Sequence, residues 1–101
     1  MAFVTVAQLS ALTPGKGICV TANGKQLALF VIDGKGYAVD ELCPHRNAPL
    51  HEGTCVGLEV RCPFHGTHFD LSTGVHRYPP CKSDIKAYAV QIVGDAVQVD
   101  V

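Results

Sequence analysis

Cys43-Pro44-His45 is followed, after sixteen intervening residues, by Cys62-Pro63-Phe64-His65. Each motif offers one thiolate and one imidazole, and each places a proline directly after its cysteine. Proline fixes its own φ and lacks an N–H group, so it stiffens a loop. Two short motifs of matching design therefore predict two loops that present sulfur and nitrogen ligands to one centre. The division of ligands suits a pair of metal ions better than a single ion.

Zinc is the main alternative occupant of such a site, because a set of two cysteines and two histidines binds tetrahedral zinc well. Zinc modules, however, usually place cysteine with cysteine and histidine with histidine, whereas both motifs here mix the two. In a Rieske centre, histidines replace two of the four cysteines of a 2Fe–2S cluster, both on one iron. The mixed pattern favours iron–sulfur, and a zinc-stapled interaction module is the less favoured reading.

The composition is that of one globular domain. The chain has 101 residues, of which 48% are hydrophobic and 17% charged, with a net charge of −1. Nothing in this balance points to nucleic acid, and no apolar run approaches the roughly 18 residues needed to cross a membrane. The first residues lack the features of a secretory signal, so we expect a cytoplasmic protein. Cys19 lies in an alternating run, which predicts a buried thiol.

Strand-like patterns dominate the chain outside the two motifs. The turn signals Asn23-Gly24, Asp33-Gly34 and Gly94-Asp95 suit tight connections between strands. One short helical candidate covers residues 7–12. The pattern predicts an all-β protein, an antiparallel sandwich or small barrel. The expected strands are 3–6, 17–21, 26–32, 37–40, 58–61, 67–70, 87–93 and 96–101.

The segment 42–86 differs from its flanks, because it holds five of the six prolines and all four proposed ligands. We interpret it as a cluster-binding subdomain inserted into a base formed by residues 1–41 and 87–101. The whole chain, 1–101, is then a single domain. An insertion with so little apolar core of its own would depend on its metal bonds for order.

The stretch from Cys43 to Pro80 resembles the Rieske family, and the wider chain is similar to the Rieske ferredoxins of bacterial aromatic-ring-hydroxylating dioxygenase systems. The matching segments are Cys43-Pro44-His45, Leu50-His51-Glu52-Gly53, Cys62-Pro63-Phe64-His65-Gly66, Phe69-Asp70, Thr73-Gly74 and Pro79-Pro80.

This resemblance implies one Rieske-type 2Fe–2S cluster, with Cys43 and Cys62 on the inner iron and His45 and His65 on the outer, solvent-facing iron. It also implies two further sets of residues. The surroundings of the cluster would be Pro44, Pro63, Gly66, Thr67, Phe69, Pro79 and Pro80. Residues that could contact a partner are Arg46, Pro49, Leu50, His51 and Phe64.

Departures from the respiratory members of the family bear on the reduction potential. Those proteins carry a disulfide between the cluster loops, but Ala48 and Phe64 stand at the corresponding positions here. They also place a serine and a tyrosine hydroxyl near the cluster sulfurs, where this chain has Thr67 and Phe69. Hydrogen bonds to the sulfurs raise the potential. The missing tyrosine hydroxyl therefore predicts a value toward the low end of the Rieske range.

The resemblance implies a one-electron carrier rather than an enzyme. It would accept electrons from an NAD(P)H-dependent flavin reductase and deliver them to a terminal oxygenase that contains Rieske and mononuclear iron centres. The alternative function is the Rieske-type small subunit of an assimilatory nitrite reductase, which would belong to a stable complex.

Overall fold

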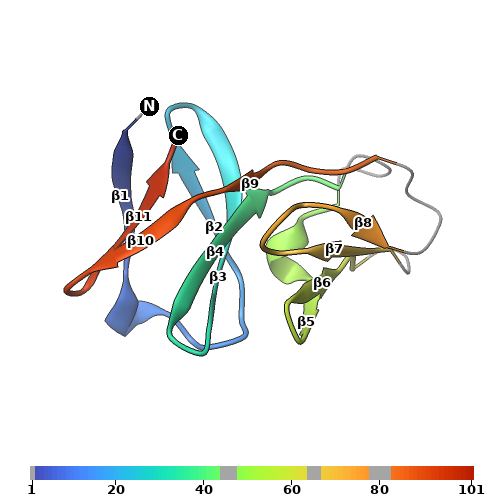
Figure 1. Cartoon of the computed structure of the whole chain (residues 1–101), viewed down its shortest axis with the longest axis horizontal. Helices are drawn as coiled ribbons and strands as arrows, with labels where there is room; N and C mark the ends of the chain where they lie inside the picture. The colour runs from blue at the N-terminus through green and yellow to red at the C-terminus, as the bar shows by residue number, and fades with distance from the viewer. Residues whose placement is uncertain (1, 44–47, 64–66, 78–82) are drawn as a thin grey trace.

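The computed structural model describes residues 2–43, 48–63, 67–77 and 83–101, and these form three antiparallel sheets (Figure 1). The first sheet has the order β1-β11-β10, the second β2-β3-β4-β9 and the third β5-β6-β7-β8. The strands are β1 (Phe3–Gln8), β2 (Ile18–Ala22), β3 (Lys25–Ile32), β4 (Lys35–Asp40), β5 (Thr54–Val56), β6 (Glu59–Arg61), β7 (His68–Asp70), β8 (His76–Arg77), β9 (Ala87–Tyr88), β10 (Val90–Val93) and β11 (Ala96–Asp100).

The second sheet is the central layer, because its strand β3 is buried on both faces. Leu27 and Leu29 pack with Val97 and Val99 of β11 in one apolar core. Ala28 and Phe30, which alternate with them, pack instead in a second core with Cys43, Cys62 and residues of the third sheet. Successive side chains of a strand point to opposite faces. β3 therefore joins the first sheet to the part of the chain that carries the two motifs.

Two predicted turns are confirmed at either end of β3. Asn23 and Gly24 both have positive φ, 50° and 76°, and Asp33 and Gly34 have φ of 52° and 78°. Each pair connects strands whose flanking residues are directly paired. Positive φ at both central residues is typical of the type I′ turn, which suits Asn-Gly and Asp-Gly.

The chain leaves the central sheet after β4 and returns to it at β9. Asp40 and Lys86 exchange two hydrogen bonds at this point, from the Asp40 N–H to the Lys86 carbonyl and from the Lys86 N–H to the Asp40 carboxylate, both at 3.0 Å. β5 to β8 lie between these two residues and pair only with one another. The division into a base and an inserted subdomain stays a prediction, which this separation of the sheets supports.

The helical candidate at residues 7–12 is wrong in its first part. β1 continues to Gln8, and only the 3-10 helix η1 (Leu9–Ala11) follows. A second 3-10 helix, η2 (Leu50–Glu52), precedes β5. No helix in the described ranges is long and apolar enough to span a membrane.

Candidate metal centre

Cys43 and Cys62 begin two loops that the backbone closes in the same way. The N–H of Cys43 donates to the carbonyl of Ala48 at 3.0 Å, and the N–H of Cys62 donates to the carbonyl of Thr67 at 2.9 Å. Both bonds therefore span five residues. The residues just outside are paired as well, Leu42 with Pro49 and Arg61 with His68. The described residues on either side of the two loops are thus paired in the same way.

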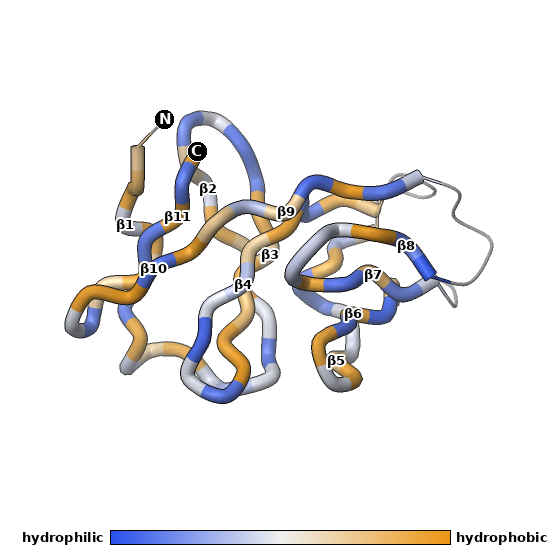
Figure 2. The backbone as a smooth tube through the Cα atoms, in the orientation of Figure 1, coloured by the Kyte–Doolittle hydropathy of each residue, from blue (hydrophilic) through white to orange (hydrophobic). Residues whose placement is uncertain are grey.

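Both cysteines lie inside one apolar core. Cys43 has 0% and Cys62 1% of its surface exposed. The same core contains Ala48, which closes the first loop, and Phe69, which follows the second. In Figure 2 the tube at β7 shows a short hydrophobic stretch between hydrophilic neighbours, because Phe69 stands between His68 and Asp70. The core fixes where the two loops begin.

The predicted surroundings of the cluster divide into described and undescribed residues. Thr67 and Phe69 are fully buried, whereas Pro63 is exposed. The remaining predictions fall outside the described residues, and they concern the ligands His45 and His65, the neighbours Pro44, Gly66, Pro79 and Pro80, and the docking candidates Arg46 and Phe64.

The docking set needs correction at one position. Leu50 is completely buried in the core beside Phe69, so its side chain is not available to a partner. His51 is partly exposed, and its contact with a partner stays a prediction. Its backbone N–H donates to Glu41 Oε1 at 3.0 Å and its ring Nδ1 contacts Glu41 Oε2. Pro49 is partly exposed and remains available.

The two described cysteines outside the motifs, Cys19 and Cys55, differ in how far they are exposed to solvent. Cys19 is exposed rather than buried. Burial and then the neighbouring Glu41 carboxylate raise its pKa. Cys55 is half-buried at the edge of the cysteine-containing core, and burial raises its pKa. Glu41 is itself buried, with 4% exposed, and its role was not apparent from a sequence in which it looks like an ordinary strand-end charge.

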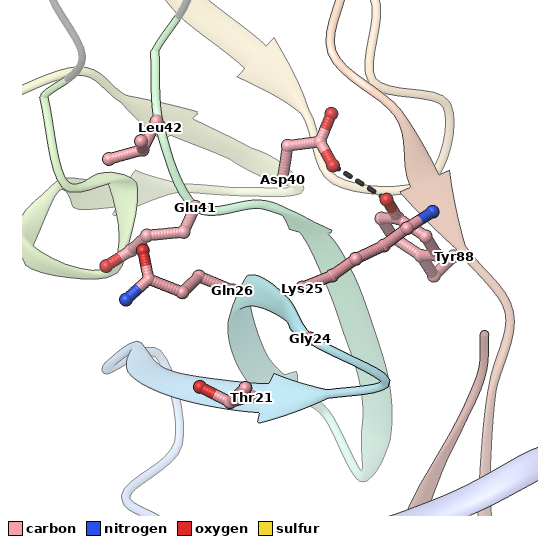
Figure 3. Close-up of a pocket in the computed structure, with 8 residues that line it drawn as sticks. All are labelled: Thr21, Gly24, Lys25, Gln26, Asp40, Glu41, Leu42 and Tyr88. Atoms are coloured by element: carbon pink, nitrogen blue, oxygen red, sulfur yellow. Dashed lines mark hydrogen bonds between the residues drawn. The ribbon is translucent and has the colours of Figure 1, made fainter.

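A groove beside the start of the insertion is lined by polar residues that include Lys25, Asp40 and Tyr88 (Figure 3). The hydroxyl of Tyr88 donates to Asp40 at 2.8 Å, and the ammonium groups of Lys25 and Lys86 lie 5.8 and 5.1 Å from the centre of its ring. Desolvation and the Asp40 carboxylate raise the pKa of Tyr88 to about 12. Tyr88 thus connects Asp40, through its hydroxyl, with the two lysines, through its ring, where the insertion rejoins the base.

The donors at the two loops fit an iron–sulfur cluster. Two thiols that begin matching loops in one apolar core are suited to bind as thiolates only if a metal balances their charge, because an isolated buried anion is very costly. The Cys-Pro-His and Cys-Pro-Phe-His motifs add one imidazole from each loop in the sequence. This is the ligand set of a cluster in which histidines replace cysteines on one iron.

Comparison with known families and structures agrees with this fit. The model of the Rieske [2Fe-2S] domain matches residues 2–89, and the chain belongs to this family. It accordingly carries one Rieske-type 2Fe–2S cluster.

Individual relatives narrow the class further. The chain is 37% identical, over 97% of its length and 94% of the relative's, to the ferredoxin component of a naphthalene 1,2-dioxygenase system from Pseudomonas aeruginosa. The ferredoxin of carbazole 1,9a-dioxygenase from Nocardioides aromaticivorans IC177 superposes with a TM-score of 0.92 at 32% identity, covering 98% of this chain and 97% of that one.

Two further structures concern the partners and the alternative function. A chain in the complex of reduced oxygenase and oxidized ferredoxin in carbazole 1,9a-dioxygenase matches with a TM-score of 0.87 at 32% identity, covering 96% of this chain and 91% of that one. A chain described as the small subunit of a NADH-dependent nitrite reductase from Mycobacterium tuberculosis matches with a TM-score of 0.89 at 25% identity, covering 97% and 93%.

Proposed function

We propose that this chain is the ferredoxin of a ring-hydroxylating oxygenase system and carries one electron at a time from an NAD(P)H-dependent flavin reductase to the oxygenase. The observation that carries the proposal is the pair of matching loops, each begun by a buried cysteine and closed by the same backbone bond. The likeness to ferredoxin components over nearly the full length of both chains supports the assignment.

In this proposal Cys43 and Cys62 hold the inner iron and His45 and His65 the outer iron. The bound cluster supplies a reversible one-electron couple. The chain's own contribution is to fix the two thiolates in a dry core and to leave only the imidazole side near solvent. Phe69 lies in that core without a hydroxyl, which supports a potential toward the low end of the Rieske range of roughly −150 to +300 mV.

Partner contact would then occur around the two loop tips. Arg46, Pro49, His51 and Phe64 remain the candidates, and Pro79-Pro80 would lie beside the cluster. The existence of a solved complex between a related ferredoxin and its oxygenase supports a terminal oxygenase as the electron acceptor. A flavin-dependent reductase is the proposed donor, and the cytoplasm, where NAD(P)H is available, is the proposed compartment.

Reduction by a reductase tests this function directly. The iron-loaded protein is mixed anaerobically with NADH and a flavin-dependent ferredoxin reductase from a dioxygenase system, and the visible bands of the cluster are followed. We expect them to bleach, and to recover when oxidised terminal oxygenase is added. Cys55→Ser should behave as wild type, whereas Cys62→Ser should lose the bands. An iron-loaded wild type that no such reductase reduces contradicts the proposal.

A nitrite reductase small subunit is the second candidate, and the match to such a subunit favours it. The two functions differ in the lifetime of the complex. A ferredoxin that serves two partners must dissociate from each, whereas a subunit stays bound. Co-purification of the tagged protein from its native host with a stoichiometric sirohaem protein would favour the nitrite reductase over the oxygenase system.

A further inference from the structure

Three potential metal ligands from distant parts of the sequence lie close together in the structure. Cys19 comes from β2, Glu41 from the residue after β4, and His51 from η2. One ligand atom of each residue lies within 4.8 Å of the other two. None of the three belongs to the four residues proposed to hold iron, so this group forms a separate cluster.

Glu41 is held firmly in this cluster. Its carboxylate receives the backbone N–H of His51 and contacts the ring Nδ1, and its carbonyl receives the N–H of Leu50 at 2.7 Å. Figure 3 shows its side chain pointing away from that of Asp40, which is committed to Tyr88. The carboxylate is thus fixed in place before any ion binds. Preorganised ligands lose less entropy when they bind.

The charges of the cluster suit a divalent cation. Within the described chain, the Glu41 carboxylate contacts the His51 ring and no lysine or arginine. Burial and then the nearby Glu41 carboxylate raise the pKa of Cys19, so its thiol keeps its proton in the metal-free protein. A thiolate, a carboxylate and a neutral imidazole together carry two negative charges, which a divalent cation neutralises.

We propose that Cys19, Glu41 and His51 bind one zinc ion. Thiolate sulfur, imidazole nitrogen and carboxylate oxygen are all zinc ligands, at about 2.3 Å for sulfur and about 2.0–2.2 Å for the others. On binding, the Cys19 S–H bond breaks, its proton goes to solvent, and a sulfur–zinc bond forms without any redox change. Cys19 is exposed, so a water molecule can complete a tetrahedral site, as in zinc sites with three protein ligands.

The zinc ion would connect the base to the cluster-binding loops. Cys19 comes from the central sheet and Glu41 directly follows its strand β4. His51 is adjacent to Leu50, which packs in the same core as Cys43 and Cys62. A bound ion stabilises the folded state in which its ligands are assembled. The site does not depend on the proposed electron-transfer role, because its ligands are distinct from those of the cluster.

Zinc titration of the iron-loaded protein tests the proposal. Calorimetry with zinc chloride, with iron measured before and after, should show one zinc bound per chain while the iron content stays constant. Cys19→Ser should weaken this binding by at least about 100-fold, since even indirect partners of metal ligands contribute 10- to 100-fold. Cys55→Ser is the matched control and should bind as wild type. Absence of zinc binding, or unchanged affinity in Cys19→Ser, overturns the proposal.

A second measurement distinguishes ligation from a change in folding. Zinc should slow the alkylation of Cys19 by iodoacetamide, measured by peptide mass spectrometry, and leave that of Cys55 unchanged. His51→Gln should remove this protection. His76→Gln is its matched control. His76 also contacts a carboxylate, that of Asp84, but in the described chain it belongs to no group of three potential metal ligands. Equal protection in the two histidine variants contradicts the proposed ligand set.

Discussion

At the residue scale, the identity of the fourth proposed ligand can be tested by exchanging it for the ligand of an ordinary cluster. His65→Cys would supply a third thiolate, which adds negative charge and stabilises the oxidised cluster. We expect the potential to move toward the roughly −400 mV of all-cysteine plant-type ferredoxins, with altered visible and electron paramagnetic resonance spectra. His68→Cys, three residues further on and outside the motif, is the control. A variant at position 65 with the wild-type spectrum and potential would exclude His65 as a ligand.

Gly74 is a residue at which a side chain has no room. Its φ is +79°, and a Cβ added there would lie 1.9 Å from the carbonyl oxygen of Ile85. Gly34 has nearly the same φ, +78°, but no atom within 4 Å of an added Cβ. Gly34→Ala should therefore cost only the strain of the left-handed conformation, about 1–2 kcal/mol. Gly74→Ala should cost that strain and roughly 1–3 kcal/mol more from overpacking.

Urea unfolding of the two variants, followed by circular dichroism, measures this difference. The cost at Gly74 should appear as a lower midpoint than in Gly34→Ala, because the carbonyl of Gly74 also accepts the N–H of Ile85. This bond connects the β7–β8 turn to the segment that precedes β9. Equal midpoints would show that the contact with Ile85 is relieved by a small backbone shift.

At the scale of elements, the sequence predicted the long strands β3 and β11 well and missed two of the short strands. β3 and β11 carry continuous or alternating apolar residues, and their predicted and observed bounds differ by one residue. β5 and β8 were not predicted. They have three and two residues, and their pairing partners define them. The equally short β6 and β7 lie inside the predicted strands 58–61 and 67–70. The predicted strand at 87–93 is divided at Ala89, because β9 pairs with β4 and β10 with β11.

The candidate site residues were likewise predicted where they are close in the sequence and missed where only the fold brings them together. The four cluster ligands were predicted because each motif is contiguous in sequence. The group of Cys19, Glu41 and His51 was not predicted, because its members are separated by 22 and 10 residues and only the tertiary structure brings them together. The exposure of Cys19 was also missed, since an alternating strand pattern does not indicate which face is covered.

The hydrogen bond from Tyr88 of β9 to Asp40 of β4 should make the stability of the folded protein depend on pH in the alkaline range. Its pKa is raised to about 12 in the folded protein, against about 10 in an unfolded chain. The protonated hydroxyl, bound to Asp40, therefore stabilises the folded state fully below pH 10, and this contribution is lost as the pH rises toward 12. Urea midpoints measured from pH 9 to 12 should fall more steeply for wild type than for Tyr88→Phe. Parallel curves would contradict the assigned role.

At the scale of the whole molecule, the two apolar cores should respond differently to loss of the cluster. One core lies between the first and second sheets and contains no cysteine. The other contains Cys43 and Cys62 and packs the third sheet against β3. Once iron is removed, the second core must accommodate loop ends no longer joined by metal bonds. The free energy of local opening should then fall most in β5 to β8.

Amide hydrogen exchange on iron-loaded and chelated protein measures this asymmetry segment by segment. Amides of β6 and β7 should exchange much faster after iron removal, while those of β10 and β11 should keep most of their protection, because the core beneath them is intact. Ala28 and Phe30 of β3 face the affected core, whereas Leu27 and Leu29 face the other, so β3 should show an intermediate loss. Uniform loss along the chain would mean that the base cannot fold without the cluster, and that both cores form one cooperative unit.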